Sequence, residues 1–249
     1  MINQVKKSKK VVEIINLKKS FGNQVILQDI SLSLMEGENL VILGKSGSGK
    51  SVLIKCLIGL LTTDSGQINV FEENMNTSTV KELALLREKI GFLFQSSALY
   101  DSMTVRQNLE FPLRRIKKNL TENQIEEKVK EVLENVGLVD SIDKMPSELS
   151  GGMRKRISLA RTLVIDPKIM LYDEPTTGLD PVTSDEISAL ILDVQKKYKT
   201  SSIIITHDVD CARVISNRMI LLVDGINYAE GTFQELTAMK DEKVSAFFK

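Results

Sequence analysis

Residues 39 to 57 read NLVILGKSGSGKSVLIKCL, and this stretch decides the fold. An apolar segment, Asn39–Leu43, leads into Gly44–Ser51, which fits the pattern G-x-x-x-x-G-K-[ST]. A helix is expected directly afterwards, over Ser51–Leu57. Glycines let several backbone N–H groups converge on phosphate oxygens, and a helix N-terminus favours the same anion. The stretch therefore predicts a phosphate-binding loop (P-loop) between a strand and a helix.

Individual residues of this loop have specific expected roles in binding a nucleotide. Lys50 is expected to neutralise the β- and γ-phosphates of a nucleotide, and the Ser51 hydroxyl is expected to be a ligand of Mg²⁺. The residues expected to contact the nucleotide are Gly44, Lys45, Ser46, Gly47, Ser48, Gly49, Lys50, Ser51 and Val52.

Two acidic residues follow a second hydrophobic strand. Ile169–Tyr172 ends at Asp173 and Glu174, which in a protein with a P-loop is the Walker B pattern. Asp173 is expected to hold Mg²⁺ through water, and Glu174 to polarise the attacking water as a general base. Taken alone, these residues would equally describe a strand followed by a polar turn.

His207 is the single histidine of the chain. Without context, a lone histidine is a surface residue or a hydrogen-bonded core residue. Here it follows the apolar segment Ser202–Thr206, and α/β sheets bind ligands at the carboxyl ends of their strands. We therefore expect His207 to contact the γ-phosphate and to take part in catalysis.

Short apolar segments alternate with helical ones over most of the chain, which predicts an α/β fold. The expected strands are Val11–Ile15, Asn39–Leu43, Gln67–Phe71, Ile90–Phe94, Ile169–Tyr172, Ser202–Thr206 and Arg218–Val223, with a hairpin through Asp224-Gly225 onto Ile226–Ala229. The later, uninterrupted apolar runs are typical of parallel strands that are covered on both faces. The earlier strands alternate more and suit a sheet with one solvated face.

The segment between Ser96 and Val164 has helical character instead. Thr121 and Gln124 form a capping-box pattern, apolar residues follow at helical spacing, and Gly137 stands where the helix should stop. Strands resume at Ile169, so this block is interpreted as a helical subdomain inserted into an α/β core. We expect one domain over residues 1–249, with the core formed by 1–95 and 166–249 and the insertion by 96–165.

Composition excludes several classes of protein. The 249 residues include 33 Lys+Arg and 33 Asp+Glu, and this balance argues against a nucleic-acid-binding protein. Two cysteines without a CxxC pair suit a reducing compartment. Neither a secretory signal nor an apolar run of about 18 residues is found. The lysines at 6, 7, 9 and 10 are interpreted as a solvated tail, with a membrane surface as the alternative. A cytoplasmic protein is expected.

Leu149-Ser150-Gly151-Gly152-Met153 precedes an expected helix over Arg154–Val164. A Ser-Gly-Gly at a helix start is either a second anion-binding site or a plain serine N-cap. The order of motifs resolves this choice: P-loop, Gln95, Ser-Gly-Gly, Asp-Glu, Asp180, His207. Over about residues 11–236, this order resembles the ATP-binding cassette (ABC) ATPases.

The resemblance implies a P-loop NTPase (RecA-like) core with an N-terminal antiparallel β-subdomain and the inserted helical subdomain. It implies that Phe21 stacks on adenine and that Gln95 approaches Mg²⁺ and the attacking water. Ser150, Gly151 and Gly152 would form the signature loop, and Asp180 the D-loop. Because one chain has its two half-sites facing apart, a homodimer with two sandwiched ATP molecules is implied. A transmembrane permease would contact the loop of Gln95.

The residues within and around these motifs resemble one subfamily more specifically. Met153 stands where the usual signature has Gln, and with residues 97–105 and 173–181 this is similar to the Mla-type phospholipid transport ATPases. That similarity implies a lipid-transporting ATPase on the cytoplasmic face of the inner membrane, with a lipid-binding periplasmic subunit and a small regulatory subunit as further partners. The alternatives are an ABC ATPase for amino-acid import, lipoprotein release or cell division, a soluble ABC protein, and an inactive scaffold.

Overall fold

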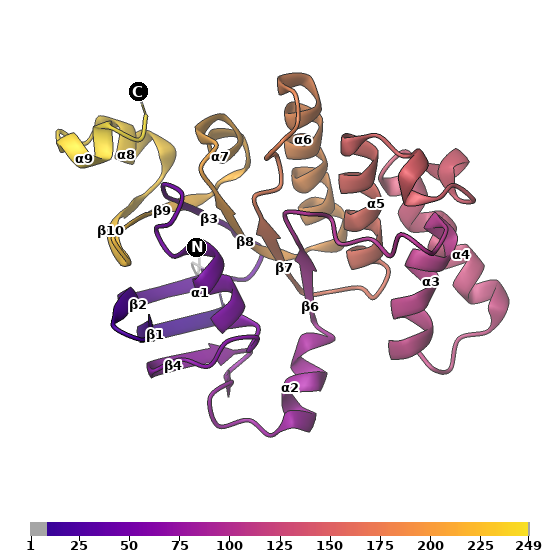
Figure 1. Cartoon of the computed structure of the whole chain (residues 1–249), viewed down its shortest axis with the longest axis horizontal. Helices are drawn as coiled ribbons and strands as arrows, with labels where there is room; N and C mark the ends of the chain where they lie inside the picture. The colour runs from indigo at the N-terminus through magenta and orange to yellow at the C-terminus, as the bar shows by residue number, and fades with distance from the viewer. Residues whose placement is uncertain (1–8, 249) are drawn as a thin grey trace, which may run out of the picture.

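The strands that flank the P-loop lie at the centre of one mixed sheet. The structure, a computed structural model, describes residues 9–248 and contains a ten-stranded sheet in the order β5-β4-β1-β2-β10-β9-β3-β8-β7-β6 (Figure 1). Five neighbouring strands are parallel: β9 (Arg218–Val223), β3 (Asn39–Leu43), β8 (Ser201–Thr206), β7 (Ile169–Asp173) and β6 (Ile90–Leu93). Their apolar runs are explained by burial on both faces.

Alternate residues of these strands enter two different cores. In β3, Val41 and Leu43 pack into one hydrophobic cluster, while Leu40 and Ile42 pack into the other. The second cluster contains α1 (Lys50–Leu57), which lies between the parallel strands and the N-terminal strands. The helix that begins at the P-loop is therefore enclosed on both sides, and this enclosure fixes the position of the loop.

The N-terminal strands are antiparallel, as the expected β-subdomain requires. They are β1 (Lys10–Phe21), β2 (Gln24–Met35), β4 (Ser65–Val70) and β5 (Glu73–Asn74), and β10 (Ile226–Gly231) joins them to β9. Strand β2 is not among the strands expected from the sequence. Its pairing with β1 changes register several times, which interrupts the alternation of buried residues, although the Gly22-Asn23 turn marks the hairpin.

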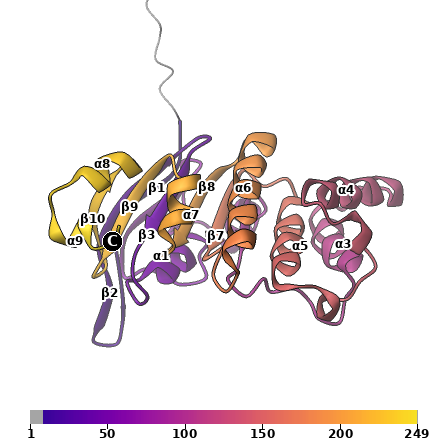
Figure 2. The same cartoon turned by 90° about the horizontal axis from the view of Figure 1, so that it is seen from above.

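Helices fill the chain between β6 and β7 and gather at one end of the molecule (Figure 2). They are α3 (Val105–Ile116), α4 (Glu122–Asn135) and α5 (Gly151–Leu163), with two short 3₁₀ turns at Val139–Ser141 and Pro146–Glu148. The expected capping box of α4 is confirmed, because Thr121 and Gln124 cap each other's backbone N–H groups. Helix α5 begins three residues earlier than expected, since Ser150 caps it.

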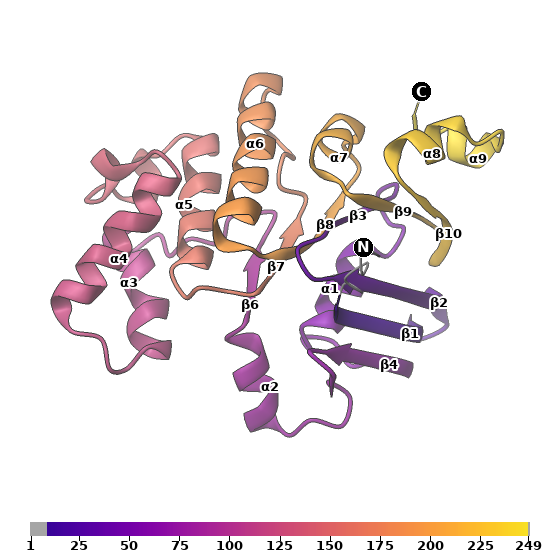
Figure 3. The same cartoon turned by 180° about the vertical axis from the view of Figure 1, so that it is seen from behind.

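The remaining helices complete the layer over the first core (Figure 3). They are α6 (Pro181–Tyr198), α7 (Val209–Ile215), α8 (Phe233–Ala238) and α9 (Glu242–Ser245), while α2 (Val80–Arg87) lies beside β6. The α/β fold class predicted from the sequence is confirmed. No helix within residues 9–248 is both long enough and apolar enough to cross a membrane.

Lys9 and Lys10 are exposed, in agreement with the interpretation of the N-terminal lysines as solvated, but Lys10 belongs to a strand rather than to a tail. Lys10 begins β1 and pairs with Glu13 at 2.6 Å, and Lys9 pairs with Glu72 at 3.2 Å. The first two lysines, Lys6 and Lys7, lie outside the described residues, as does most of the segment tested for a secretory signal.

Gly66 offers a test of the close packing between β4 and β1. Its φ is +91°, and a Cβ there would lie 2.5 Å from the carbonyl oxygen of Asn16. Gly37 has a similar φ of +75°, but nothing lies within 4 Å of its Cβ position. We expect Gly66→Ala to lower the free energy of unfolding by about 1–3 kcal/mol more than Gly37→Ala does, because only Gly66→Ala adds a steric clash. Urea unfolding of both variants measures the difference; equal losses would contradict the packing.

Candidate functional site

Three neighbouring strands end at one cleft of about 460 Å³. Gly44 follows β3, Glu174 follows β7 and His207 follows β8. The strands are hydrogen-bonded in parallel register, so these three residues meet at the same edge of the sheet. The residues that line the cleft include Gly44, Lys45, Ser46, Gly47, Lys50, Gln95, Glu174 and His207. Most of the expected phosphate-binding and catalytic residues are therefore brought together.

The P-loop has the conformation that its glycines permit. Gly47 and Gly49 have φ values of +82° and +102°, and a Cβ at Gly49 would lie 2.8 Å from a methyl carbon of Leu27. Gly49 is the N-cap of α1, so the backbone turns directly into the helix. The ammonium of Lys50 donates to the carbonyl oxygens of Gly44 at 2.7 Å and Lys45 at 3.1 Å. A cation and a helix N-terminus thus face the same cleft, which suits a polyphosphate.

The carboxylate of Glu174 is held by its neighbours on several sides. It is 8% exposed, and its φ of +50° is unusual for a residue other than glycine. Its Oε2 lies 2.8 Å from Nδ1 of His207 and accepts a hydrogen bond from Thr177 Oγ1 at 3.1 Å. Its Oε1 lies 3.5 Å from the Lys50 ammonium. A carboxylate oriented in this way, beside a polyphosphate site, can accept a proton from water.

Asp173, the last residue of β7, and Ser51, in the first turn of α1, lie together in an arrangement that fits a divalent cation. The Ser51 hydroxyl donates to Asp173 Oδ1 at 3.4 Å, so two oxygen ligands from β7 and α1 meet there. Burial and the neighbouring Glu174 raise the pKa of Asp173, and a nearby cation would offset both effects. Within residues 9–248, no three His, Cys, Asp or Glu side chains gather closely enough to hold a metal by themselves. The arrangement therefore suits Mg²⁺, which is usually bound by few protein ligands together with substrate phosphates.

Lys155 is a site residue that the sequence analysis missed. Its side chain is 4% exposed, and its ammonium donates to the carbonyl oxygens of Gln95 at 2.6 Å and Glu174 at 3.4 Å. Burial lowers its pKa to about 8, and the charges of Asp173 and Glu174 oppose that effect. The sequence holds one signal for its burial: Lys155 stands four residues before Leu159, and residues at this spacing share a face of a helix, here the buried face of α5. The lysine links the helix after Ser150 to the backbone beside the cleft.

Other predicted residues lie away from this cleft. Phe21 ends β1 with 48% of its surface exposed, and the Lys19 ammonium lies 5.3 Å from the centre of its ring. Val52 is half-buried in α1, and the Ser48 hydroxyl is buried without a hydrogen-bond partner among the described residues. Phe21 is thus not brought to the phosphate-binding residues.

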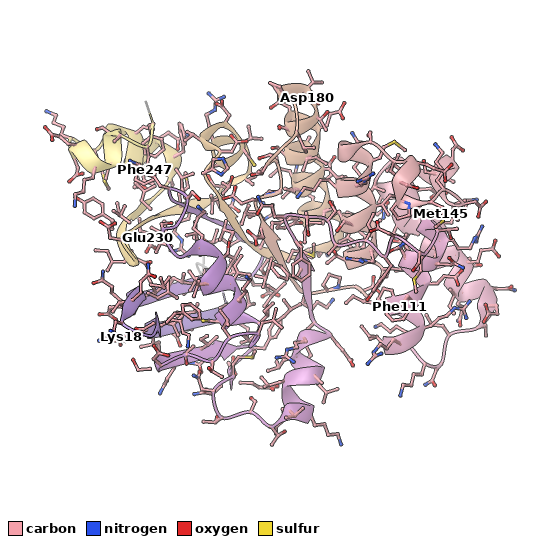
Figure 4. All side chains as sticks on the ribbon, in the orientation of Figure 1. Lys18, Phe111, Met145, Asp180, Glu230 and Phe247 are labelled. Carbon is pink, nitrogen blue, oxygen red and sulfur yellow. The ribbon has the colours of Figure 1, made fainter. Side chains whose placement is uncertain are left out.

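The predicted signature and D-loop residues form a separate group at the N-termini of α5 and α6. Ser150 caps α5 by accepting from the backbone N–H of Met153 at 3.3 Å, and Asp180 caps α6 by accepting from Thr183 at 3.0 Å. A Cβ at Gly152 would lie 2.6 Å from the Thr183 methyl carbon, whereas a Cβ at Gly151 would lie 3.7 Å from Leu179. Ser150, Gly151 and Asp180 are exposed, and Figure 4 shows Asp180 at the end of α6.

Comparison with known proteins gives consistent matches. Residues 27–177 match the family described as "ABC transporter". The probable ribonucleotide transport ATP-binding protein mkl of Mycobacterium leprae (strain TN) is 44% identical over 211 residues, covering 85% of this chain and 60% of its own length. The methionine import ATP-binding protein MetN of Legionella pneumophila (strain Lens) is 39% identical over 215 residues, covering 86% and 62%. The chain thus spans about 60% of the length of these two relatives, and neither name specifies lipid transport.

Solved structures agree with the sequence matches. CbiO1 from Clostridium perfringens, described as part of the ABC transporter complex cbiONQ, has a TM-score of 0.85 and 31% identity, covering 95% of this chain and 92% of its own. The ATP-binding cassette MJ0796, solved as a dimer in a post-hydrolysis state with ADP and Pi, has a TM-score of 0.80 and 31% identity, covering 89% and 98%. Since the family match spans more than half of the chain, this protein belongs to the ABC transporter family, through the ATPase domain that in this family binds ATP with Mg²⁺ and hydrolyses it.

Proposed function

We propose that this protein hydrolyses ATP in the cleft at the ends of β3, β7 and β8. The observation that carries the proposal is the placement of the Glu174 carboxylate, 2.8 Å from His207 Nδ1 and 3.5 Å from the Lys50 ammonium. Lys50 and the P-loop N–H groups bind and orient the phosphates, and Glu174 accepts the proton of the attacking water. His207 positions the carboxylate and contacts the γ-phosphate. Ser51, Asp173 and Gln95 are the residues that would hold Mg²⁺, and that ion would supply neutralisation of charge on the phosphate oxygens.

The active form in this proposal is a homodimer with two ATP molecules between the subunits. Ser150, Gly151 and Asp180 are exposed on the same chain but do not line its own P-loop cleft. A two-fold dimer would place the signature residues of each subunit on the ATP of the other. The dimeric MJ0796 structure, with ADP and Pi, supports this arrangement by similarity.

A permease in the membrane is the proposed partner, and residues 96–165 are the proposed helical subdomain that contacts it. Lys155 joins this subdomain to the carbonyl oxygen of Gln95, and Arg161 of the same helix donates to the carbonyl oxygen of Ala98 at 2.7 Å. Beside them, Tyr100 is 45% exposed, with the Arg161 guanidinium 5.7 Å from its ring centre. Through these contacts, α5 would transmit a displacement at Gln95 to the exposed surface around Tyr100. The subunit would act at the cytoplasmic face of the inner membrane.

For the transported substrate, we propose phospholipid. This proposal rests on Met153 in the predicted signature and on the sequences of residues 97–105 and 173–181. These features are similar to those of the Mla-type ATPases. A lipid-binding periplasmic subunit and a small regulatory subunit belong to the same proposal. A second candidate, import of a small solute, is favoured by the names of the relatives, which refer to ribonucleotide transport and methionine import.

Replacing Asp173 tests the proposed Mg²⁺ site. Asp173→Asn keeps the shape of the side chain but removes the charge that attracts the cation. We expect the Mg²⁺-dependent gain in ATP affinity to fall at least tenfold, while ATP affinity in EDTA stays within about twofold. Calorimetric titration of ATP with and without Mg²⁺ measures both values. An unchanged Mg²⁺-dependent gain would contradict the assignment of Asp173.

Replacing Glu174 tests the proposed general base and the dimer together. Glu174→Gln removes proton acceptance but retains the size of the side chain, so it should bind Mg-ATP, dimerise and hydrolyse at least a hundredfold more slowly. Phosphate release measures the rate of hydrolysis, and light scattering measures the ATP-dependent dimerisation. A wild-type rate of hydrolysis would contradict the role of Glu174.

The matched control for dimerisation is Ser150→Arg added to Glu174→Gln. The arginine lies on the exposed N-terminus of α5, outside the P-loop cleft, so nucleotide binding by the monomer should persist while the ATP-dependent dimer disappears. A dimer that persists at the same ATP concentration would contradict the sandwiched arrangement.

The proposed substrate is tested by capture of partners from membranes. Tagged Glu174→Gln protein with Mg-ATP should hold the closed complex in detergent extracts, and mass spectrometry identifies the proteins and lipids retained. A permease with a membrane-anchored lipid-binding subunit and bound phospholipid is the expected result. A permease with a small-solute-binding protein would favour import, and capture of no membrane protein would contradict a transport role.

A further inference from the structure

The segment after α8 lies against the P-loop. Ala246 and Phe247, which follow α9, line the cleft described above together with residues 44–47 of the loop. They also line a second cleft of about 590 Å³, which shares Lys45, Ser46 and Gly47 with the first. Figure 4 labels Phe247 just below the helices α8 and α9 in that view. Phe247 thus stands where the two clefts adjoin.

This segment is fixed to the core rather than loosely attached. Val244 is 1% exposed within the first hydrophobic cluster, and the ring of Phe248 packs edge-on against Phe233 at 5.5 Å. Asp241 caps α9 by accepting from the backbone N–H of Val244 at 3.0 Å, and it also accepts from the Tyr228 hydroxyl at 2.9 Å. These contacts hold Phe247 at a defined position relative to the loop.

The second cleft has the chemistry of a base and ribose site. Its lining combines the apolar residues Val25 and Ile26 at the start of β2 with P-loop residues 45–48 and with the charged residues Asp224 and Lys243. Phe247 is the one aromatic residue among the described residues that line it, and Phe21 does not line it. A triphosphate on the P-loop would leave its nucleoside beside this mixture of apolar and polar groups. An aromatic ring there offers a π-face to a purine.

We propose that Phe247 is a specificity-determining residue of the nucleotide site, whose ring contacts the base and ribose of ATP in the second cleft beside Val25 and Ile26. The proposal rests on the proposed binding of ATP by the P-loop. It assigns to the C-terminal segment a direct part in nucleotide recognition, whereas Phe21, for which the family resemblance implies stacking on adenine, lines neither cleft. The P-loop and Lys50 bind the phosphates in this proposal.

The experiment compares two probes on Phe247→Ala: Mg-ATP, which has a nucleoside, and inorganic tripolyphosphate with Mg²⁺, which has none. We expect the affinity for ATP to fall about tenfold and the affinity for tripolyphosphate to stay within twofold, both measured by calorimetry. Phe247→Tyr should restore ATP affinity, because it keeps the ring. Phe111→Ala, which removes a partly exposed phenyl ring from α3, is the matched control and should leave both affinities unchanged.

Three results would overturn the proposal. Unchanged ATP affinity in Phe247→Ala would show that the ring makes no contact with the nucleoside. Tighter binding of both probes would show that the ring covers the site. An equal loss of affinity for both probes would show that the substitution acts through the P-loop or through folding. Thermal unfolding of the variant distinguishes these last two causes. Failure of the wild-type protein to bind either probe would instead contradict the proposed function itself.

Discussion

The geometry of the site depends on one constraint: three adjacent strands run parallel and end at the same edge of the sheet. β3, β8 and β7 are hydrogen-bonded in register, and their last residues are followed by Gly44, His207 and Glu174. Backbone hydrogen bonds continue this alignment beyond the strands, from Glu174 N–H to the carbonyl oxygen of Ile205 at 2.9 Å. Groups that are far apart in the sequence are therefore held within hydrogen-bonding distance before any ligand arrives, and this preorganisation favours catalysis.

Much of this arrangement could be predicted from the sequence because each part has a local signal. The P-loop pattern, the Asp173-Glu174 pair and His207 each follow an apolar strand, and parallel strands place such residues together. The strand Asn39–Leu43 has the predicted bounds. The strand β2 could not be recognised by alternation alone, because shifts of register against β1 break the period of two, so that Leu27 and Ile30 are both buried although three residues apart.

Contacts between elements that are distant in the sequence were harder to predict, because no local sequence pattern indicates them. Lys155 lies within an amphipathic helix, and its partners, the carbonyl oxygens of Gln95 and Glu174, are set by tertiary packing rather than by spacing. The position of Phe247 against the P-loop depends on how α8 and α9 fold back over β10, which no local pattern specifies. Residues that complete a site from a remote segment are therefore the part that sequence motifs leave out.

Lys155 also illustrates how stability and function differ in this fold. Burial lowers its pKa from the usual 10.5 to about 8, so near neutral pH the lysine remains charged in a poorly solvated position. Because the unfolded chain binds this proton more tightly, the lysine opposes folding below pH 8, and stability should rise with pH between about 8 and 10.5. An apolar residue at this position would avoid that opposition. The ammonium instead donates hydrogen bonds from α5 to the carbonyl oxygens of Gln95 and Glu174, two residues that line the cleft. The Lys155 ammonium thus weakens folding through its burial while it holds the backbone of Gln95 and Glu174 against α5.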